Sequence, residues 1–91
     1  MSVNHLHAEL DLGANDVVEV TLTRQANAML MDRPNYAAYV SGRGHSYFGG
    51  YATHSPTILT PPRAGRWNLV IDLGGAPGTV SATYRVIPGA H

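Results

Sequence analysis

The segment Arg66-Trp67-Asn68-Leu69-Val70-Ile71-Asp72-Leu73 decides the fold class of this chain. Its largest apolar side chains occur at every second position: Trp67, Leu69, Ile71 and Leu73. The positions between them hold Asn68, Val70 and Asp72. Successive side chains of a β-strand point to opposite faces, so this period of two predicts a strand with one strongly apolar face. We expect it to be the central strand of a sheet.

The same alternation recurs on both sides of this segment, between turns rich in Gly, Pro, Asn and Asp. The clearest examples are residues 6–10 and 17–23. The further strands that we expect are Ala26–Met31, Gly44–Ala52, Thr57–Thr60 and Thr79–Ile87. In the last of these, the side chains expected to face inward are Val80, Ala82, Tyr84 and Val86. In the strand 26–31 the inward face stays open, because two alternating pairs compete for the core: Ala28 with Leu30, and Met29 with Met31.

One short helix is expected near residues 33–41. Asp32 is a suitable N-cap residue, and Gly42 is a suitable stop. About seven strands, each apolar on one face, need a second sheet to cover that face. The sequence therefore predicts an all-β, single-domain fold over residues 1–91, an antiparallel β-sandwich or flattened barrel with one short helix.

Length and composition exclude several function classes. A chain of 91 residues has one modest core and no room for the deep cleft of a large multi-step enzyme. Without cysteine it has no disulfides, thiolate nucleophiles or cysteine-based zinc modules. Residues 1–7 lack the basic start and apolar run of a secretory signal, and no apolar stretch approaches the roughly 18–20 residues of a membrane span. We therefore expect a cytoplasmic protein without membrane contact.

The overall net charge of zero hides two oppositely charged segments. Residues 1–32 carry five carboxylates against Arg24 alone, a net charge of −4. Residues 33–71 carry four arginines and no carboxylate, a net charge of +4. This positive segment also holds most of the aromatic side chains and two of the five histidines, side chains that stack on rings and contact anions or partner proteins.

We therefore predict a binding surface in segment 33–54, made of Arg33, Tyr36, Tyr39, Arg43, His45, Tyr47, Tyr51 and His54. The alternative interpretation is structural: the aromatic side chains fill one end of the sandwich while the arginines are solvated. No catalytic residues and no cofactor are predicted. Gly44-His45-Ser46-Tyr47-Phe48 resembles a serine nucleophile elbow but has Phe48 in place of the closing glycine.

His5 and His7 have the spacing that places two imidazoles on the same face of a strand. They would form a metal site if a third ligand, such as Glu9, His45 or His54, came close. Because two histidines on a solvent-facing strand are commoner than a metal site, we predict no bound metal and keep this pair as an alternative.

Several ordered motifs along nearly the whole chain resemble the bacterial DUF1883 family. They are His5-Leu6-His7, Asp16 to Leu22, Asn27, Leu30-Met31-Asp32, Asn35-Tyr36, Tyr39, Gly42-Arg43, Tyr47, Gly49-Gly50, Ser55-Pro56, Pro62, Gly65-x-Trp67 and Val70-x-Asp72-Leu73-Gly74-Gly75. The resemblance implies a small β-sandwich and no activity, because the family is defined as one of unknown function. Some relatives carry this domain ahead of a TIR domain, which implies a sensor or adaptor role in bacterial defence signalling. We expect any such link here to be made in trans or to be only ancestral.

Together these observations predict a non-catalytic recognition or adaptor module that binds a partner protein, or an anionic or aromatic small ligand, through segment 33–54. The alternative is single-stranded nucleic-acid binding by the same segment, with its tyrosines stacking on bases. Binding of that kind would weaken steeply with salt. An exposed edge strand would also allow a homodimer.

Overall fold

A computed structural model describes residues 5–74 and 78–89. In this part of the chain, seven strands form two antiparallel sheets and one short helix packs on the outside, which confirms the predicted fold class. The strands are β1 (Leu6–Leu12), β2 (Val17–Leu22), β3 (Ala26–Met31), β4 (Phe48–Ala52), β5 (Thr57–Leu59), β6 (Gly65–Asp72) and β7 (Ala82–Ile87), and the helix is α1 (Arg33–Val40).

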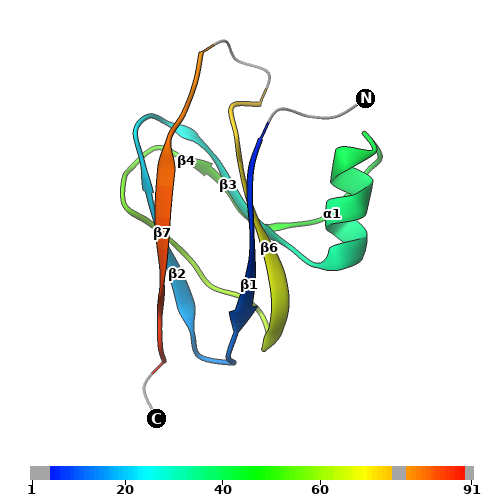
Figure 1. Ribbon diagram of the computed structural model, residues 1–91, viewed down its shortest axis with the longest axis vertical. Coiled ribbons are helices and arrows are strands. Elements are labelled where there is room, and N and C mark those ends of the chain that lie inside the picture. Colours follow the sequence, from blue (N-terminus) through cyan, green and yellow to red (C-terminus); the bar gives the residue numbers. More distant parts are fainter. Residues whose placement is uncertain (1–4, 75–77, 90–91) are drawn as a thin grey trace.

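The strand order is β1-β6-β3-β4 in the larger sheet and β5-β2-β7 in the smaller one (Figure 1). The deciding segment of the sequence is β6, which lies between β1 and β3 and is therefore a central strand, as predicted. Four strands, β1, β4, β5 and β7, are therefore sheet edges. None of the described residues forms a helix that is long and apolar enough to cross a membrane.

The core between the sheets comes from the inner faces of the alternating strands. Trp67, Leu69 and Ile71 of β6 are at most 3% exposed and pack against Val18 and Val20 of β2, which are fully buried. The predicted alternation of β6 is confirmed, because Val70 belongs to a separate cluster on the opposite face of the sheet.

Strand β3 resolves its ambiguous pattern by burying both of its faces. Ala28 and Leu30 belong to the core between the sheets. Met29 and Met31 pack on the other side, against Val70 and Tyr39 of α1. The sequence could not show which pair faces the core, because both pairs are apolar. Both are buried because the helix covers the outer face of the larger sheet (Figure 1).

Helix α1 begins and ends where the sequence predicted. The Asp32 carboxylate accepts a hydrogen bond from the backbone N–H of Asn35 at 3.0 Å, the interaction of an N-cap residue. This hydrogen bond is the main reason why the pKa of Asp32 is lowered from its ordinary value of 3.8. Gly42 follows the helix with a φ of 75°, a left-handed conformation that glycine adopts without steric cost.

Two predicted strands differ from the structure. Strand β4 begins at Phe48 rather than at Gly44, because residues 41–47 fold back against the helix. Gly49, in the predicted Gly49-Gly50 bend, has a φ of 114°, and a Cβ atom there would lie 2.3 Å from the Ala28 carbonyl oxygen. Tyr84 lies opposite Val20 and so faces inward as predicted, but it is 46% exposed on the edge strand β7, which begins at Ala82 rather than at Thr79.

Candidate functional site

Six aromatic and imidazole rings meet where α1 and the following loop lie over the outer face of the larger sheet. We call this set the ring cluster: His5, His7, Tyr36, Tyr39, His45 and Tyr47. His7 stacks on Tyr36 with ring centroids 4.1 Å apart and planes within 12°. Residues far apart in sequence thus come together, because β1 supplies His7 and α1 supplies Tyr36.

The other ring contacts extend the cluster from β1 to the loop after the helix. His5 meets Tyr39 edge-on at 5.1 Å, and its Nε2 atom lies 2.9 Å from the Tyr36 hydroxyl. On the far side, Tyr39 meets His45 edge-on at 5.2 Å, and His45 lies 5.9 Å from Tyr47. Edge-to-face and stacked pairs at these separations are attractive, so the contacts hold the rings in fixed positions.

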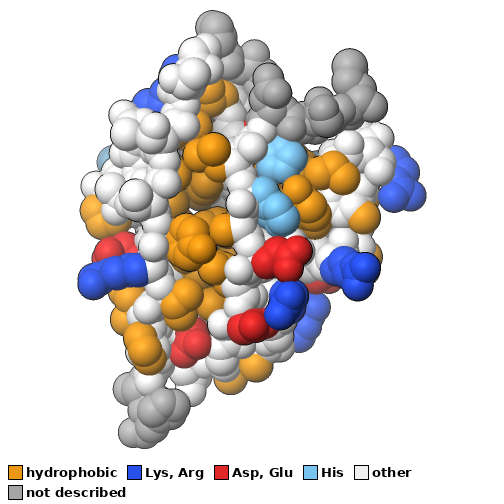
Figure 2. Space-filling view, viewed as in Figure 1, with side chains coloured by type: hydrophobic (Ala, Val, Ile, Leu, Met, Phe, Trp, Pro, Cys, Tyr) orange, Lys and Arg blue, Asp and Glu red, His pale blue; other side chains and the backbone are white. Residues whose placement is uncertain are grey.

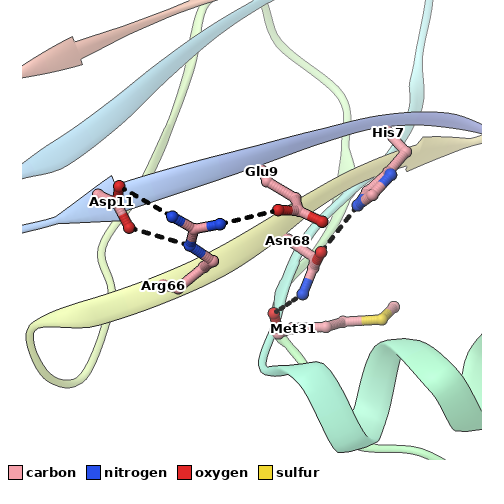
Figure 3. Close-up of polar contacts among 6 residues, drawn as sticks. All are labelled: His7, Glu9, Asp11, Met31, Arg66 and Asn68. Carbon is pink, nitrogen blue, oxygen red and sulfur yellow. Dashed lines mark hydrogen bonds and ion pairs between the residues drawn. The ribbon is translucent and has the colours of Figure 1, made fainter.

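His7 has a defined tautomer because of its hydrogen bond to Asn68 (Figure 3). The Asn68 Nδ2 group donates to the Met31 carbonyl at 3.3 Å, which turns Oδ1 toward His7. Oδ1 only accepts hydrogen bonds, so Nε2 of His7, 2.8 Å away, must carry a proton and donate.

Tyr39 is the buried member of the cluster, with 5% of its surface exposed. Its hydroxyl donates to the Asp72 carboxylate. Burial, followed by this hydrogen bond and the charge of Asp72, raises the pKa of Tyr39 well above its ordinary value of 10.0. Tyr39 was predicted as part of a binding surface, but its side chain is sealed between α1 and the sheet and serves to hold the helix.

Two of the four arginines of the positive segment are paired with carboxylates of the acidic segment. Arg66 lies 3.1 Å from both Glu9 and Asp11 (Figure 3), and Arg63 lies 3.5 Å from Asp32. The two charged segments of the sequence therefore neutralise each other in part. Within the described residues, Arg33 and Arg43 make no ion pair, and they flank α1 at its start and just beyond its end.

The loop between α1 and β4 is held to the helix by hydrogen bonds. The backbone N–H of Arg43 donates to the Ala38 carbonyl at 2.9 Å, and that of Ser46 donates to Asn35 Oδ1 at 2.8 Å. His45 Nδ1 lies 3.1 Å from the Arg43 carbonyl oxygen. The loop thus presents the exposed side chains of Arg43 and Tyr47 from an ordered backbone, next to the ring cluster.

The remaining predicted site residues lie apart from the ring cluster. Tyr51 is 61% exposed on β4, and its hydroxyl donates to Gln25 at 3.0 Å. His54 is exposed in the loop after β4, and Arg33 is exposed at the start of α1. None of these three residues makes a ring contact with the cluster in the described part of the chain. Segment 33–54 thus divides into residues gathered by the helix and its following loop, and residues that β4 carries elsewhere.

His5 and His7, predicted only as an alternative metal pair, belong to the ring cluster instead. Their rings are 6.3 Å apart, and the described residues contain no group of three potential metal ligands. Glu9, the possible third ligand that is nearest to the two histidines in the sequence, pairs with Arg66. The alternation of β1 could have placed both histidines on the outer face, but it could not show that the helix lies there.

A family model described as a domain of unknown function, DUF1883, matches residues 3–89. No curated protein and no solved structure matches the chain.

Proposed function

The chain belongs to the DUF1883 family, and we propose that it is a non-catalytic recognition or adaptor module. Its binding surface, which we call the recognition surface, consists of His7, Tyr36, Arg43, His45 and Tyr47. The partner that fits this surface best is a protein segment that offers a carboxylate to Arg43 and an apolar or aromatic side chain to Tyr47. An anionic or aromatic small ligand would use the same groups.

The observation that carries this proposal is the ordered presentation of Arg43 and Tyr47. Tyr47 is 45% exposed, while its neighbour His45 rests on the buried Tyr39. Tyrosine and arginine are the residues most often responsible for binding energy at protein interfaces. A loop that is already hydrogen-bonded loses little conformational entropy on binding, so its contacts contribute more fully to affinity.

The hydrogen bonds of the histidines favour recognition over catalysis. His7 is bonded to an amide, His5 to a phenol and His45 to a backbone carbonyl. An amide or a backbone carbonyl orients a ring, whereas a general base in nucleophilic catalysis must lie beside a hydroxyl or thiol that attacks a substrate. Of these three histidines only His5 lies beside a hydroxyl, that of Tyr36. The cluster is therefore better suited to a fixed contact surface than to chemistry.

Binding of single-stranded nucleic acid is the second candidate, and the ion pairs weigh against it. Arg63 and Arg66 already contact carboxylates, which leaves Arg33 and Arg43 for phosphates. Association through two phosphate contacts would be weak at physiological salt. A bacterial, cytoplasmic adaptor that meets a TIR-domain protein in trans is the more specific form of our proposal. A TIR domain is accordingly the first partner to test.

Site-specific photo-crosslinking tests the proposal in the native cell. A photoreactive phenylalanine at position 47 should give a discrete crosslinked protein. The same group at position 58 should not, because Ile58 is 50% exposed on β5 of the other sheet. Equal crosslinking at both positions, or crosslinking only at position 58, would contradict the proposed recognition surface.

A further inference from the structure

The two sheets part along one side of the sandwich, between the edge strands β1 and β7. Leu6 of β1 lies opposite Ile71, and Tyr84 of β7 lies opposite Val20, so both belong to the inner faces of their sheets. Inner-face side chains are normally covered by the second sheet, yet Leu6 is 41% exposed and Tyr84 is 46% exposed. Figure 2 shows hydrophobic side chains in the opening between these two strands. The sandwich is therefore not closed here.

This opening is a crevice of about 240 Å³ that reaches the core. Its floor includes Val20, Leu69 and Ile71, which are at most 3% exposed. Ala8 of β1 and Ala82 of β7 line its two sides. Alanine is the smallest side chain that an inner-face position carries on either strand, and larger residues at these two positions would fill the space.

The charges around the crevice define the chemistry that it accepts. Among the described residues that line it there is no Asp, Glu, Lys or Arg; besides Tyr84, the lining residues with polar side chains are His7 and Thr83. On the outer faces of the strands that border it, Arg66 is paired with Glu9 and Asp11, and Arg85 is paired with Glu19. A charged ligand would lose its hydration in such a place without gaining a partner. The crevice therefore complements an uncharged, apolar group.

The size of the crevice limits that group to a small one. An α-helix has a diameter of about 10–12 Å with its side chains and would not enter. Because a dry apolar cavity of about 150 Å³ accepts benzene, the crevice has room for about ten carbon atoms by proportion. The exposed Leu6 and Tyr84 show that it opens to solvent, where the polar end of an amphiphile would stay hydrated.

We propose that the crevice between β1 and β7 binds an alkyl or acyl chain of about ten carbon atoms, with its polar end in solvent. This site shares His7 with the recognition surface, whose other residues lie on or beside α1, over the outer face of the larger sheet. The alkyl chain could belong to a free amphiphile or to a membrane lipid, since both combine an apolar chain with a polar end.

Titration of the full chain with 1-octanol, followed by methyl NMR spectra, tests this site. Saturable shift changes are expected for the methyl groups of Ala8, Ala82, Leu69 and Ile71. Ala8→Leu and Ala82→Leu, which fill the crevice from opposite sides, should each weaken octanol binding at least about tenfold, because the three added carbons displace a similar part of the ligand. Ala37→Leu, the same change at an exposed position of α1, should leave binding unaltered.

Ala8→Leu and Ala82→Leu are both used, so that if one fails to fold the other still tests the site. Dispersed amide NMR spectra are the criterion of folding. Sedimentation with phosphatidylcholine vesicles distinguishes the two sources of the alkyl chain. If the protein sediments with the vesicles, the alkyl chain belongs to a membrane lipid; if the protein stays in solution, it belongs to a free amphiphile. The proposal is overturned if octanol causes only non-saturable shifts, or shifts centred elsewhere. It is equally overturned if both filled variants bind octanol as tightly as Ala37→Leu.

Discussion

The hydroxyl of Tyr39 donates a 2.5 Å hydrogen bond to Asp72 Oδ2, which joins α1 to the end of the central strand β6. Asp72 is 8% exposed, and its other oxygen accepts from Asn27 Nδ2 at 2.7 Å and from the Gly74 N–H at 2.9 Å. A buried carboxylate with three donors is stabilised only while all three remain in place. The position of the helix, and of the recognition surface beside it, depends on this contact.

Replacing Tyr39 by Phe should destabilise the fold by about 1–3 kcal/mol, because the change leaves the buried Asp72 carboxylate without one of its donors. Urea unfolding measures this loss. Tyr51→Phe is the matched control, since its hydroxyl bonds to Gln25 on the surface, and it should change stability by less than about 0.5 kcal/mol. Equal effects of the two variants would show that the Tyr39 contact does not anchor the helix.

Alkaline pH should weaken the fold through the same residue. The pKa of Tyr39 is raised in the folded protein above its ordinary value of 10.0, so the neutral phenol is favoured by folding. The resulting stability is fully present below pH 10 and is lost as pH rises toward the folded-state pKa. The free energy of unfolding of the wild type should therefore fall faster above pH 10 than that of Tyr39→Phe. Parallel curves would contradict the assignment.

The Asp32 cap should contribute about 1 kcal/mol, measured as the loss of unfolding free energy in Asp32→Ala. Asp32→Asn keeps a capping oxygen and should recover most of it. The pKa of Asp32 is lowered from 3.8, so the charged carboxylate is favoured by folding. The charge-dependent part of its contribution is present above pH 3.8 and is lost as pH falls through the folded-state pKa, so the difference between wild type and Asp32→Ala should narrow there. A constant difference down to pH 2 would contradict this role.

Trp67→Ala should cost about 3–5 kcal/mol, because the ring is 1% exposed and its removal leaves a large cavity. The indole Nε1–H also donates to the Arg63 carbonyl at 3.1 Å, and the Arg63 guanidinium lies 4.9 Å from the ring centre. The stability of Trp67→Phe should lie between those of the wild type and Trp67→Ala, since phenylalanine keeps most of the apolar volume. Thermal unfolding followed by circular dichroism gives the order of the three stabilities. A near-normal melting temperature for Trp67→Ala would refute the central position of β6.

The strands could be predicted because their alternation is a local property of the chain. In β6, the residues Trp67, Leu69 and Ile71 face the core as the sequence indicated. Tyr84 follows the same pattern and faces inward in register, but it is exposed because β7 is an edge strand among the described residues. Whether an inner-face residue is covered depends on how two sheet edges approach each other, and no local pattern encodes this.

The candidate site could be predicted only in part. The aromatic richness around Tyr36, His45 and Tyr47 identified the helix and its loop, but the same pattern included Tyr39, which is buried by its partner Asp72. The pairing of Arg66 with Glu9 joins residues 57 positions apart. Contacts at such separations arise from the order of strands in the sheet, which a single sequence does not specify.

The affinity of the crosslinked partner for purified variants tests the central claim most directly. Arg43→Ala and Tyr47→Ala should each raise the dissociation constant at least about tenfold, corresponding to ~1.4 kcal/mol, while the melting temperature stays within a few degrees of wild type. Ile58→Ala, on the other sheet, should bind like the wild type. Unchanged affinity in both Arg43→Ala and Tyr47→Ala, with folding intact, would contradict the assignment of recognition to this surface.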